Sequence, residues 1–182
     1  GTILLDFSDG VKYEKVNFGF DALGYNEVII NTGKGHADLS AEYSSIPNEM
    51  RLVAKELGAD NLCGTDEASL LKKLPAIRAK LGNDRAIMRA LHYFEECGRV
   101  ENAAKELENG NTEEVLRMID ESGRSSWEWL QNVYCINDPK EQSISLALAL
   151  TKLYINKIGS GVCRIHGGGF AGVIMAVIPE EK

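Results

Sequence analysis

Four glycines and one aromatic residue near the carboxyl end of the chain form the stretch best suited to binding an anion. Gly167, Gly168, Gly169 and Gly172 surround Phe170, the only large side chain among them. Glycine permits positive φ angles and leaves backbone N–H groups uncovered, so a phosphate could approach this loop closely. The simpler interpretation is a glycine-rich turn between two buried strands, and the number of glycines alone favours that interpretation.

The residues on either side of the glycine loop predict a strand before it and a strand after it. Val162–Ile165 can be extended, and Val173–Ile178 is rich in β-branched residues. A Rossmann fingerprint needs a helix after its glycines, and a Walker A loop needs Lys-Ser or Lys-Thr, which this loop lacks. The loop therefore matches neither of these nucleotide-binding motifs.

A second group of polar residues follows an earlier predicted strand. His36 and Asp38 come just after that strand, and Tyr43 follows on the next predicted helix. The imidazole and the carboxylate could orient the hydroxyls of a ligand or pair with each other. A single histidine with no second ligand nearby argues against a metal site. Tyr43 could hydrogen-bond a ligand, but a half-buried tyrosine with a satisfied hydroxyl is the default interpretation from the residues alone.

Four charged or titratable residues lie on one face of the longest predicted helix. Arg89, His92, Glu96 and Arg99 follow one another at spacings of three, four and three residues. Such a set could take part in catalysis, but the favoured interpretation is a buried ion network that holds the helix to the sheet.

Other polar and aromatic residues have simpler interpretations. Ser122 and Ser125 have no adjacent His–Asp partners and are expected to cap the next helix. A core or interface role is the default for the aromatic group of Trp127, Trp129 and Tyr134.

Composition limits the class of protein. With 182 residues, 44% of them hydrophobic, the chain predicts one compact domain, or one domain with a small appendage. The net charge of −7 argues against nucleic acid or an anionic membrane as a partner. No apolar run approaches the roughly 20 residues of a membrane span. The four scattered cysteines favour reduced cytosolic thiols over a disulfide framework or a zinc site.

The order of predicted elements indicates an α+β fold, with strands first, helices in the middle and a strand pair at the end. We expect one layer of helices against a mostly antiparallel sheet. Beside the final strand pair, the predicted strands are a hairpin of Thr2–Phe7 and Val11–Phe18, and Glu27–Thr32. The predicted helices are one that Ser40 can cap and that Pro47 either splits or restarts, short ones within Asn61–Leu74 and over Leu74–Leu81, and then Asp84–Asn109, Glu113–Glu121, Ser125–Val133 and a buried Glu141–Ile158.

Several motifs resemble those of the GHMP kinases in their galactokinase form. Arg164-Ile-His-Gly-Gly-Gly-Phe-Ala-Gly172 resembles Arg-x-Thr-Gly-Gly-Gly-Phe-Gly-Gly, with His166 in place of Thr and Ala171 in place of Gly. Residues 89–100 resemble the signature Arg-Ala-x-His…Glu-Asn-x-Arg-Val, and the Asn31-Thr32, His36 and Tyr43 series also has a counterpart. The resemblance covers nearly the whole chain.

The resemblance implies a ferredoxin-like two-layer sandwich, which is the carboxyl-terminal domain of such a kinase. Residues 1–25 would be lead-in strands from the junction with a missing amino-terminal kinase domain, and 26–182 the domain itself. The implied activity is ATP-dependent phosphorylation of galactose or a related hexose at the anomeric hydroxyl, in the cytoplasm, with ATP and Mg²⁺ bound by the full-length enzyme and neither by this chain alone.

The implied roles can be assigned residue by residue. Tyr43, His36 and Asp38 would contact the sugar, and Gly167–Phe170 would lie near the nucleotide phosphates. The chain would hold no catalytic residue and no metal ligand, because the catalytic Asp and Arg belong to the amino-terminal domain. We therefore expect the isolated chain to be inactive.

Departures from the family pattern keep an alternative open. Ile46-Pro47-Asn48 occupies the region of a family Arg pair, Gly123 replaces a His and Cys97 an Asn. The serine-rich phosphate loop is absent, as are the helix and strand that usually follow the glycine loop. The alternative is a non-catalytic sugar-sensing or dimerisation module, and the missing strand would leave an exposed sheet edge through which a homodimer could form.

Overall fold

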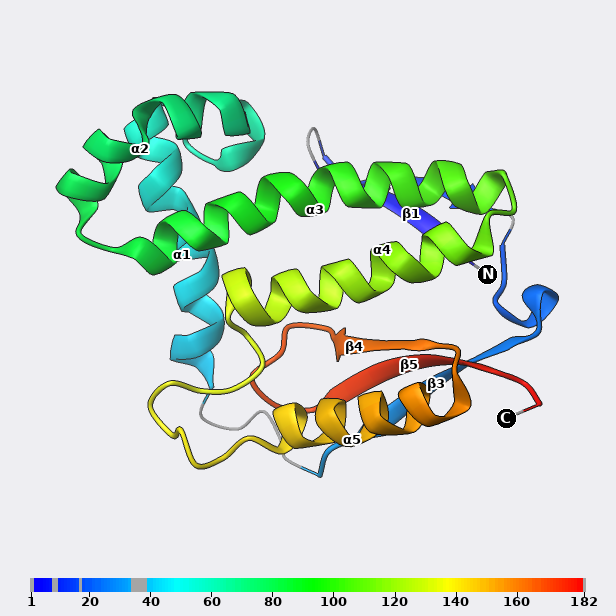
Figure 1. The fold of residues 1–182 in the computed structure, drawn as a ribbon. Coiled ribbons are helices and arrows are strands. Elements are labelled where there is room, and N and C mark those ends of the chain that lie inside the picture. Colours follow the sequence, from blue (N-terminus) through cyan, green and yellow to red (C-terminus); the bar gives the residue numbers. More distant parts are fainter. Residues whose placement is uncertain (1, 8–9, 17, 34–38, 182) are drawn as a thin grey trace.

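The computed structural model of the chain describes residues 2–7, 10–16, 18–33 and 39–181 (Figure 1). Its strands form two separate antiparallel sheets, one of two strands and one of three. The strands are β1 (Thr2–Asp6), β2 (Lys12–Val16), β3 (Tyr25–Asn31), β4 (Val162–His166) and β5 (Val173–Pro179). The helices are α1 (Ser40–Leu57), α2 (Glu67–Leu81), α3 (Asp84–Glu108), α4 (Thr112–Ser125) and α5 (Ser143–Ile158), with short turns η1 (Asp21–Leu23), η2 (Leu62–Gly64) and η3 (Ser126–Leu130).

The three-stranded sheet brings the ends of its strands to the glycine loop. Its order is β3-β5-β4, and Val173 at the start of β5 lies opposite both Asn31 and His166. The loop between His166 and Val173 therefore emerges where β3 ends. The backbone N–H and the hydroxyl of Thr32 both donate to the Gly172 carbonyl, at 2.9 and 2.8 Å, which fixes β3 to the loop.

Helices cover both faces of this sheet (Figure 1). On one face, Leu148 of α5 belongs to the same buried cluster as Ile165 and Ile174 of the strands. On the other face α4 lies against β4, and a methyl group added to Gly123 would be 2.9 Å from the Cβ of Arg164. The predicted α+β class is confirmed. The structure adds a helix on the second face, whereas one helical layer was expected.

A second core lies away from the sheet, where α1, α2 and α3 meet. Val53, Leu70 and Ala90 are completely buried there, one from each helix. This core holds α1 and α3 in place, and these two helices carry most of the polar residues discussed below. Among the described residues, no helix has the length and apolar character that crossing a bilayer requires.

Two prolines lie inside helices that the sequence predicts as broken. Helix α1 continues through Pro47, and its amino-terminal cap is Leu39, so Ser40 is a helical residue and not a cap. Helix α2 is a single helix that contains Pro75, and the Asp66 side chain caps it by accepting from the Ser69 N–H at 2.7 Å. Burial of residues beyond each proline, such as Val53 and Ile77, compensates for the hydrogen bond that proline cannot donate.

Helix α5 is buried on one side only, so the prediction of a fully buried helix is wrong. Leu146, Leu150 and Leu153 expose 61%, 58% and 67% of their surface, although the opposite side packs on the sheet. An all-round apolar pattern predicts burial on all sides. The described residues cover only the side that faces the sheet.

Candidate functional site

The glycine loop packs against the first turns of α1 through Tyr43. The Tyr43 hydroxyl donates to the Gly169 carbonyl at 2.7 Å, and its ring meets Phe170 edge to face, with centroids 5.6 Å apart. A methyl group on Gly168 would lie 2.6 Å from the Tyr43 ring, so only glycine fits there. Burial raises the pKa of the Tyr43 phenol, which keeps the hydroxyl protonated as a donor.

Asn132 holds the same loop from another direction. Its backbone carbonyl accepts from the Phe170 N–H at 2.5 Å, and its side-chain amide donates to the Gly168 carbonyl at 3.2 Å. A methyl group on Gly169 would lie 2.3 Å from the Asn132 carbonyl oxygen. Phe170 has a φ of +60°, a conformation that residues other than glycine seldom adopt. We infer that contacts on both sides hold the loop in this strained form.

These contacts limit what the loop can offer to an anion. The N–H groups of Phe170 and Ala171 already donate to protein carbonyls. Gly168 and Gly169 are needed for close packing, whereas a methyl group added at Gly167 would meet nothing within 4 Å. The loop can therefore form a wall beside a phosphate, approached from the Gly167 side, but it does not enclose one. Over the described residues no group of three His, Cys, Asp or Glu could hold a metal ion.

A buried charge cluster lies where α1, α3 and η3 meet. Arg89 is 1% exposed and donates to Glu49 at 2.9 Å, to Ser45 at 2.9 Å and to the Leu130 carbonyl at 3.0 Å. Glu49 also accepts from Arg85 at 2.6 Å. Burial alone would raise the pKa of Glu49, but the hydrogen bonds from Arg85 and the charge of Arg89 outweigh it and lower that pKa. Glu49 therefore stays ionised between two guanidinium groups.

A separate network joins α3 to the sheet. Glu96 accepts from Arg99 and from Ser122 of α4, and Arg164 of β4 approaches the same carboxylate at 3.5 Å. The predicted helix-to-sheet network is present, but Arg89 belongs to the other cluster, so the four residues on one helix face separate into two groups. Ser122 serves this network and does not cap a helix.

His92 completes this network on the side of α4. Its Nδ1 lies 2.8 Å from the Ser125 hydroxyl, so Ser125 also has a role other than the predicted cap. Burial lowers the pKa of His92, and the nearby charge of Glu96 only partly opposes that effect. The imidazole is therefore neutral near pH 7.

The comparisons with known proteins agree with the motifs in the sequence. No family model matches the chain. It is 28% identical over 159 residues to the galactokinase of Actinobacillus pleuropneumoniae serotype 3 (strain JL03), a match that covers 87% of the chain and 38% of that protein. It is 29% identical over 155 residues to the galactokinase of Pasteurella multocida (strain Pm70), which covers 85% of the chain and 37% of the relative.

A solved structure supports the same assignment at the level of fold. The crystal structure of Lactococcus lactis galactokinase complexed with galactose matches 94% of this chain and 41% of that one, with a TM-score of 0.69 and 23% sequence identity. Over most of its length the chain is therefore similar in sequence and in fold to galactokinases. It spans about two fifths of the length of the relatives that it matches.

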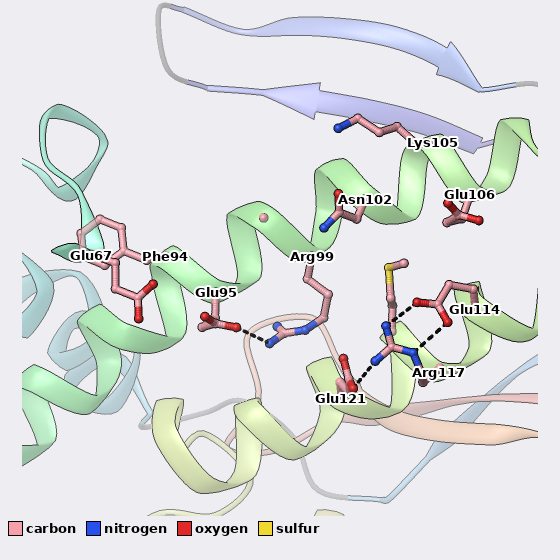
Figure 2. A pocket seen from close by; sticks show the side chains of 12 residues that line it. Glu67, Phe94, Glu95, Arg99, Asn102, Lys105, Glu106, Glu114, Arg117 and Glu121 are labelled. Carbon is pink, nitrogen blue, oxygen red and sulfur yellow. Dashed lines mark hydrogen bonds and ion pairs between the residues drawn. The ribbon is translucent and has the colours of Figure 1, made fainter. Parts of the chain in front are cut away.

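A charged groove lies apart from the glycine loop. It occupies about 500 Å³ between α3 and α4, and Figure 2 shows the side chains that line it. Arg117 pairs with Glu114 and Glu121, and Arg99 lies 3.7 Å from Glu95. The guanidinium groups of Arg117 and Arg99 are thus neutralised by carboxylates of the same groove, so the groove is an ion-paired surface.

The structure places some of the predicted site residues and leaves others open. Tyr43 and Gly167–Phe170 lie together, as described above. His36 and Asp38 lie outside the described residues, so their proposed contact with a sugar stays a prediction. Sequence reasoning missed Asn132 and Glu49, because each acts on residues at least 34 positions away in the chain.

Proposed function

We propose that the chain provides one wall of the active-site cleft of a galactokinase-like sugar kinase. That enzyme would transfer the γ-phosphoryl group of ATP to the anomeric hydroxyl of galactose or a related hexose. The observation that carries the proposal is the hydrogen bond from Tyr43, the predicted sugar contact, to Gly169 in the predicted phosphate-facing loop, at 2.7 Å.

This contact suits the demands of phosphoryl transfer, which depends on positioning the acceptor and the phosphate in line. Tyr43 and Asn132 hold the glycine loop from two sides, so the loop is fixed before any substrate arrives. Because the fixed glycine loop lies next to Tyr43, it would keep the distance between the anomeric hydroxyl of the sugar and the γ-phosphate of ATP constant. His36 and Asp38 would orient other sugar hydroxyls.

The cofactors of the proposed enzyme would be held mainly by the rest of the polypeptide. ATP supplies the phosphoryl group, and Mg²⁺ neutralises phosphate charge when bound. Since the described residues offer no metal-binding group, we assign the magnesium ligands, the catalytic Asp and the catalytic Arg to an amino-terminal domain. The division into lead-in strands 1–25 and a domain 26–182, and a location in the cytoplasm, are parts of the same proposal.

A non-catalytic sugar-sensing or dimerisation module is the second candidate. The feature that favours it is β3, which among the described strands pairs with β5 alone and so has one free edge. A free edge strand can pair with another chain, which would give a homodimer.

The test compares this chain with the full-length protein encoded by the natural gene. With ATP, Mg²⁺ and galactose, the purified 182-residue chain should form no sugar phosphate, whereas the full-length protein should form it. In the full-length protein Tyr43→Phe should lower kcat/KM for galactose by about tenfold, the effect of a lost hydrogen bond in the cleft.

A matched control separates the cleft from a general loss of stability. Tyr25→Phe removes the hydroxyl that lies 3.1 Å from Ser160, at the end of β3 away from the glycine loop, and should leave kcat/KM unchanged. If the full-length protein binds galactose but does not phosphorylate it, the proposed kinase function is wrong and the sugar-sensing function is favoured. Phosphorylation by the isolated chain would refute the proposed assignment of the catalytic residues.

A further inference from the structure

The two side chains that hold the glycine loop are carried by segments that bind the same buried guanidinium group. Tyr43 lies two residues before Ser45 on α1, and the Ser45 hydroxyl accepts from Arg89 at 2.9 Å. Asn132 lies two residues after Leu130, whose carbonyl accepts from Nε of Arg89 at 3.0 Å. Both supports of the loop are therefore anchored to Arg89.

Arg89 joins the two segments through the rigid geometry of its side chain. The nitrogen that binds Ser45 also donates to Glu49 of α1 at 2.9 Å, so this end of the guanidinium group is fixed to α1 by two contacts. The group is planar, so its contacts to α1 and to the Leu130 carbonyl fix the distance between the two segments. A lysine ammonium is a single point charge that could pair with Glu49 but could not hold both segments at once.

The backbone at the glycine loop is strained and depends on such support. Phe170 has a φ of +60°, and Gln131, which links Leu130 to Asn132, has a φ of +57°. Strained backbone of this kind persists only where the surrounding structure over-determines it. The Oδ1 atom of Asn132 is also buried with no hydrogen-bond partner among the described residues, which costs stability. Asn132 therefore keeps an orientation that supports the loop although its oxygen is left unpaired.

Close packing does not fix the loop on the side of Arg89. A cavity of about 40 Å³ lies there, and its lining includes Arg89, Ser45, Gln131 and Phe170. Its volume is enough for about one water molecule, so the Phe170 side chain has room to shift. The position of the loop on this side is thus set by the hydrogen bonds of its two supports.

We propose that Arg89 is a positioning residue of the sugar kinase and that it acts on the reaction through the glycine loop. The proposal rests on the proposed function, in which the loop lies beside the phosphates of ATP. Without the guanidinium group, α1 and the segment before Asn132 move independently, the strained Phe170 relaxes, and the loop leaves its place beside the γ-phosphate. Phosphoryl transfer depends on that placement. Arg89 itself is 1% exposed and acts without touching a substrate.

Arg89→Lys tests the proposal because it keeps the charge that pairs with Glu49 and removes the planar group. Hydrogen exchange of the Phe170 amide, which donates to the Asn132 carbonyl, is followed in the 182-residue chain by NMR. We expect exchange to become about tenfold faster, the effect of one lost hydrogen bond on a local opening. Ser45→Ala removes the hydroxyl contact alone and should accelerate exchange by about threefold. This variant decides the question if Arg89→Lys does not fold.

Leu70→Ala is the control for a general loss of stability. Leu70 is completely buried in the core of α1, α2 and α3, so its truncation should accelerate exchange in α2 and leave that of Phe170 unchanged. Equal acceleration at Phe170 in Leu70→Ala would overturn the proposal, because overall stability would then control the loop. Parental exchange in Arg89→Lys would also overturn it, since Arg89 would then serve only as the partner of Glu49. A Phe170 amide that is unprotected in the parent chain would lead to the same conclusion.

The kinase assay tells this proposal apart from the proposed function. In the full-length protein, at a temperature at which the variant is fully folded, Arg89→Lys should lower kcat for galactose by about tenfold and change KM by less than about twofold. Leu70→Ala should keep the parental kcat under the same conditions. A parental kcat in Arg89→Lys would overturn the proposal and leave the proposed function standing. Faster exchange at Phe170 in a full-length protein that phosphorylates no sugar would refute the proposed function and leave Arg89 as the anchor of the loop.

Discussion

Gly168→Ala should destabilise the domain because Tyr43 occupies the space that the new methyl group needs. The added Cβ would lie 2.6 Å from Cε1 and 3.2 Å from Cδ1 of that ring. Carbon atoms in contact prefer separations of about 3.5 to 4.0 Å, so the ring must move by about 1 Å. Gly168 is not among the glycines with positive φ, so alanine introduces no backbone strain of that kind.

The expected cost combines two effects. Moving the ring breaks the 2.7 Å hydrogen bond from Tyr43 to Gly169, at about 1 kcal/mol, and overpacking costs about 1 to 3 kcal/mol. We therefore expect Gly168→Ala to lower the free energy of unfolding by about 2 to 4 kcal/mol. Since the clash involves one partner, Gly168→Ala in a Tyr43→Ala background should cost at least about 1 kcal/mol less than it does alone.

Urea denaturation followed by circular dichroism measures all of these variants. Gly98→Ala is the control, because an added methyl group there meets nothing within 4 Å in the middle of α3, and it should stabilise the domain by about 0.5 to 1 kcal/mol. Two results would show that Tyr43 does not hold the loop as described. One is a free energy of unfolding for Gly168→Ala within about 0.5 kcal/mol of that of the parent domain. The other is a Tyr43→Ala/Gly168→Ala variant whose loss of stability equals the sum of the two single losses.

Two further predictions concern the buried polar groups. Glu49→Gln leaves the Arg89 guanidinium, 1% exposed, without its charged partner and should cost about 3 to 5 kcal/mol in urea denaturation, whereas Glu114→Gln in an exposed pair should cost less than about 1 kcal/mol. A Glu49→Gln cost as small as that of the control would contradict the account of this cluster. For His92, burial lowers the folded pKa below the unfolded value of about 6.5, so its contribution to stability is present above that pH and is lost as pH falls below it. Thermal unfolding from pH 7 to 5 should show a smaller loss of Tm in His92→Asn, which can still pair with Ser125, and an identical loss would refute the assignment.

The sequence predicts those parts of the fold that depend on local pattern. Apolar residues at helical spacing place α3 almost residue for residue, and the strands that flank the glycine loop are correct because β-branched residues favour extended backbone. Local pattern misleads at Pro47 and Pro75, where packing beyond each proline keeps one helix intact. Local pattern also mispredicts the burial of α5, because the periodicity of apolar residues does not show how many faces of a helix pack against other elements.

The candidate site follows from sequence only in part. The Tyr43 and glycine-loop motifs lie together, but the residues that hold them come from elsewhere. Asn132 follows a π-helical turn that no residue pattern marks, and Glu49 pairs with Arg89 forty positions away. Such partners depend on how the helices cross, which is a property of the folded chain.

The contact between Gly123 and Arg164 restricts how this protein can diverge. Helix α4 lies so close to β4 that the hydrogen atom of a glycine fills the gap, with the Arg164 Cβ only 2.9 Å from where a side chain would begin. Any larger residue at 123 must push the helix away from the strand, which would also separate Ser122 from Arg164 and loosen the Glu96 network. Natural variants of this protein should therefore change residue 123 only together with its neighbours.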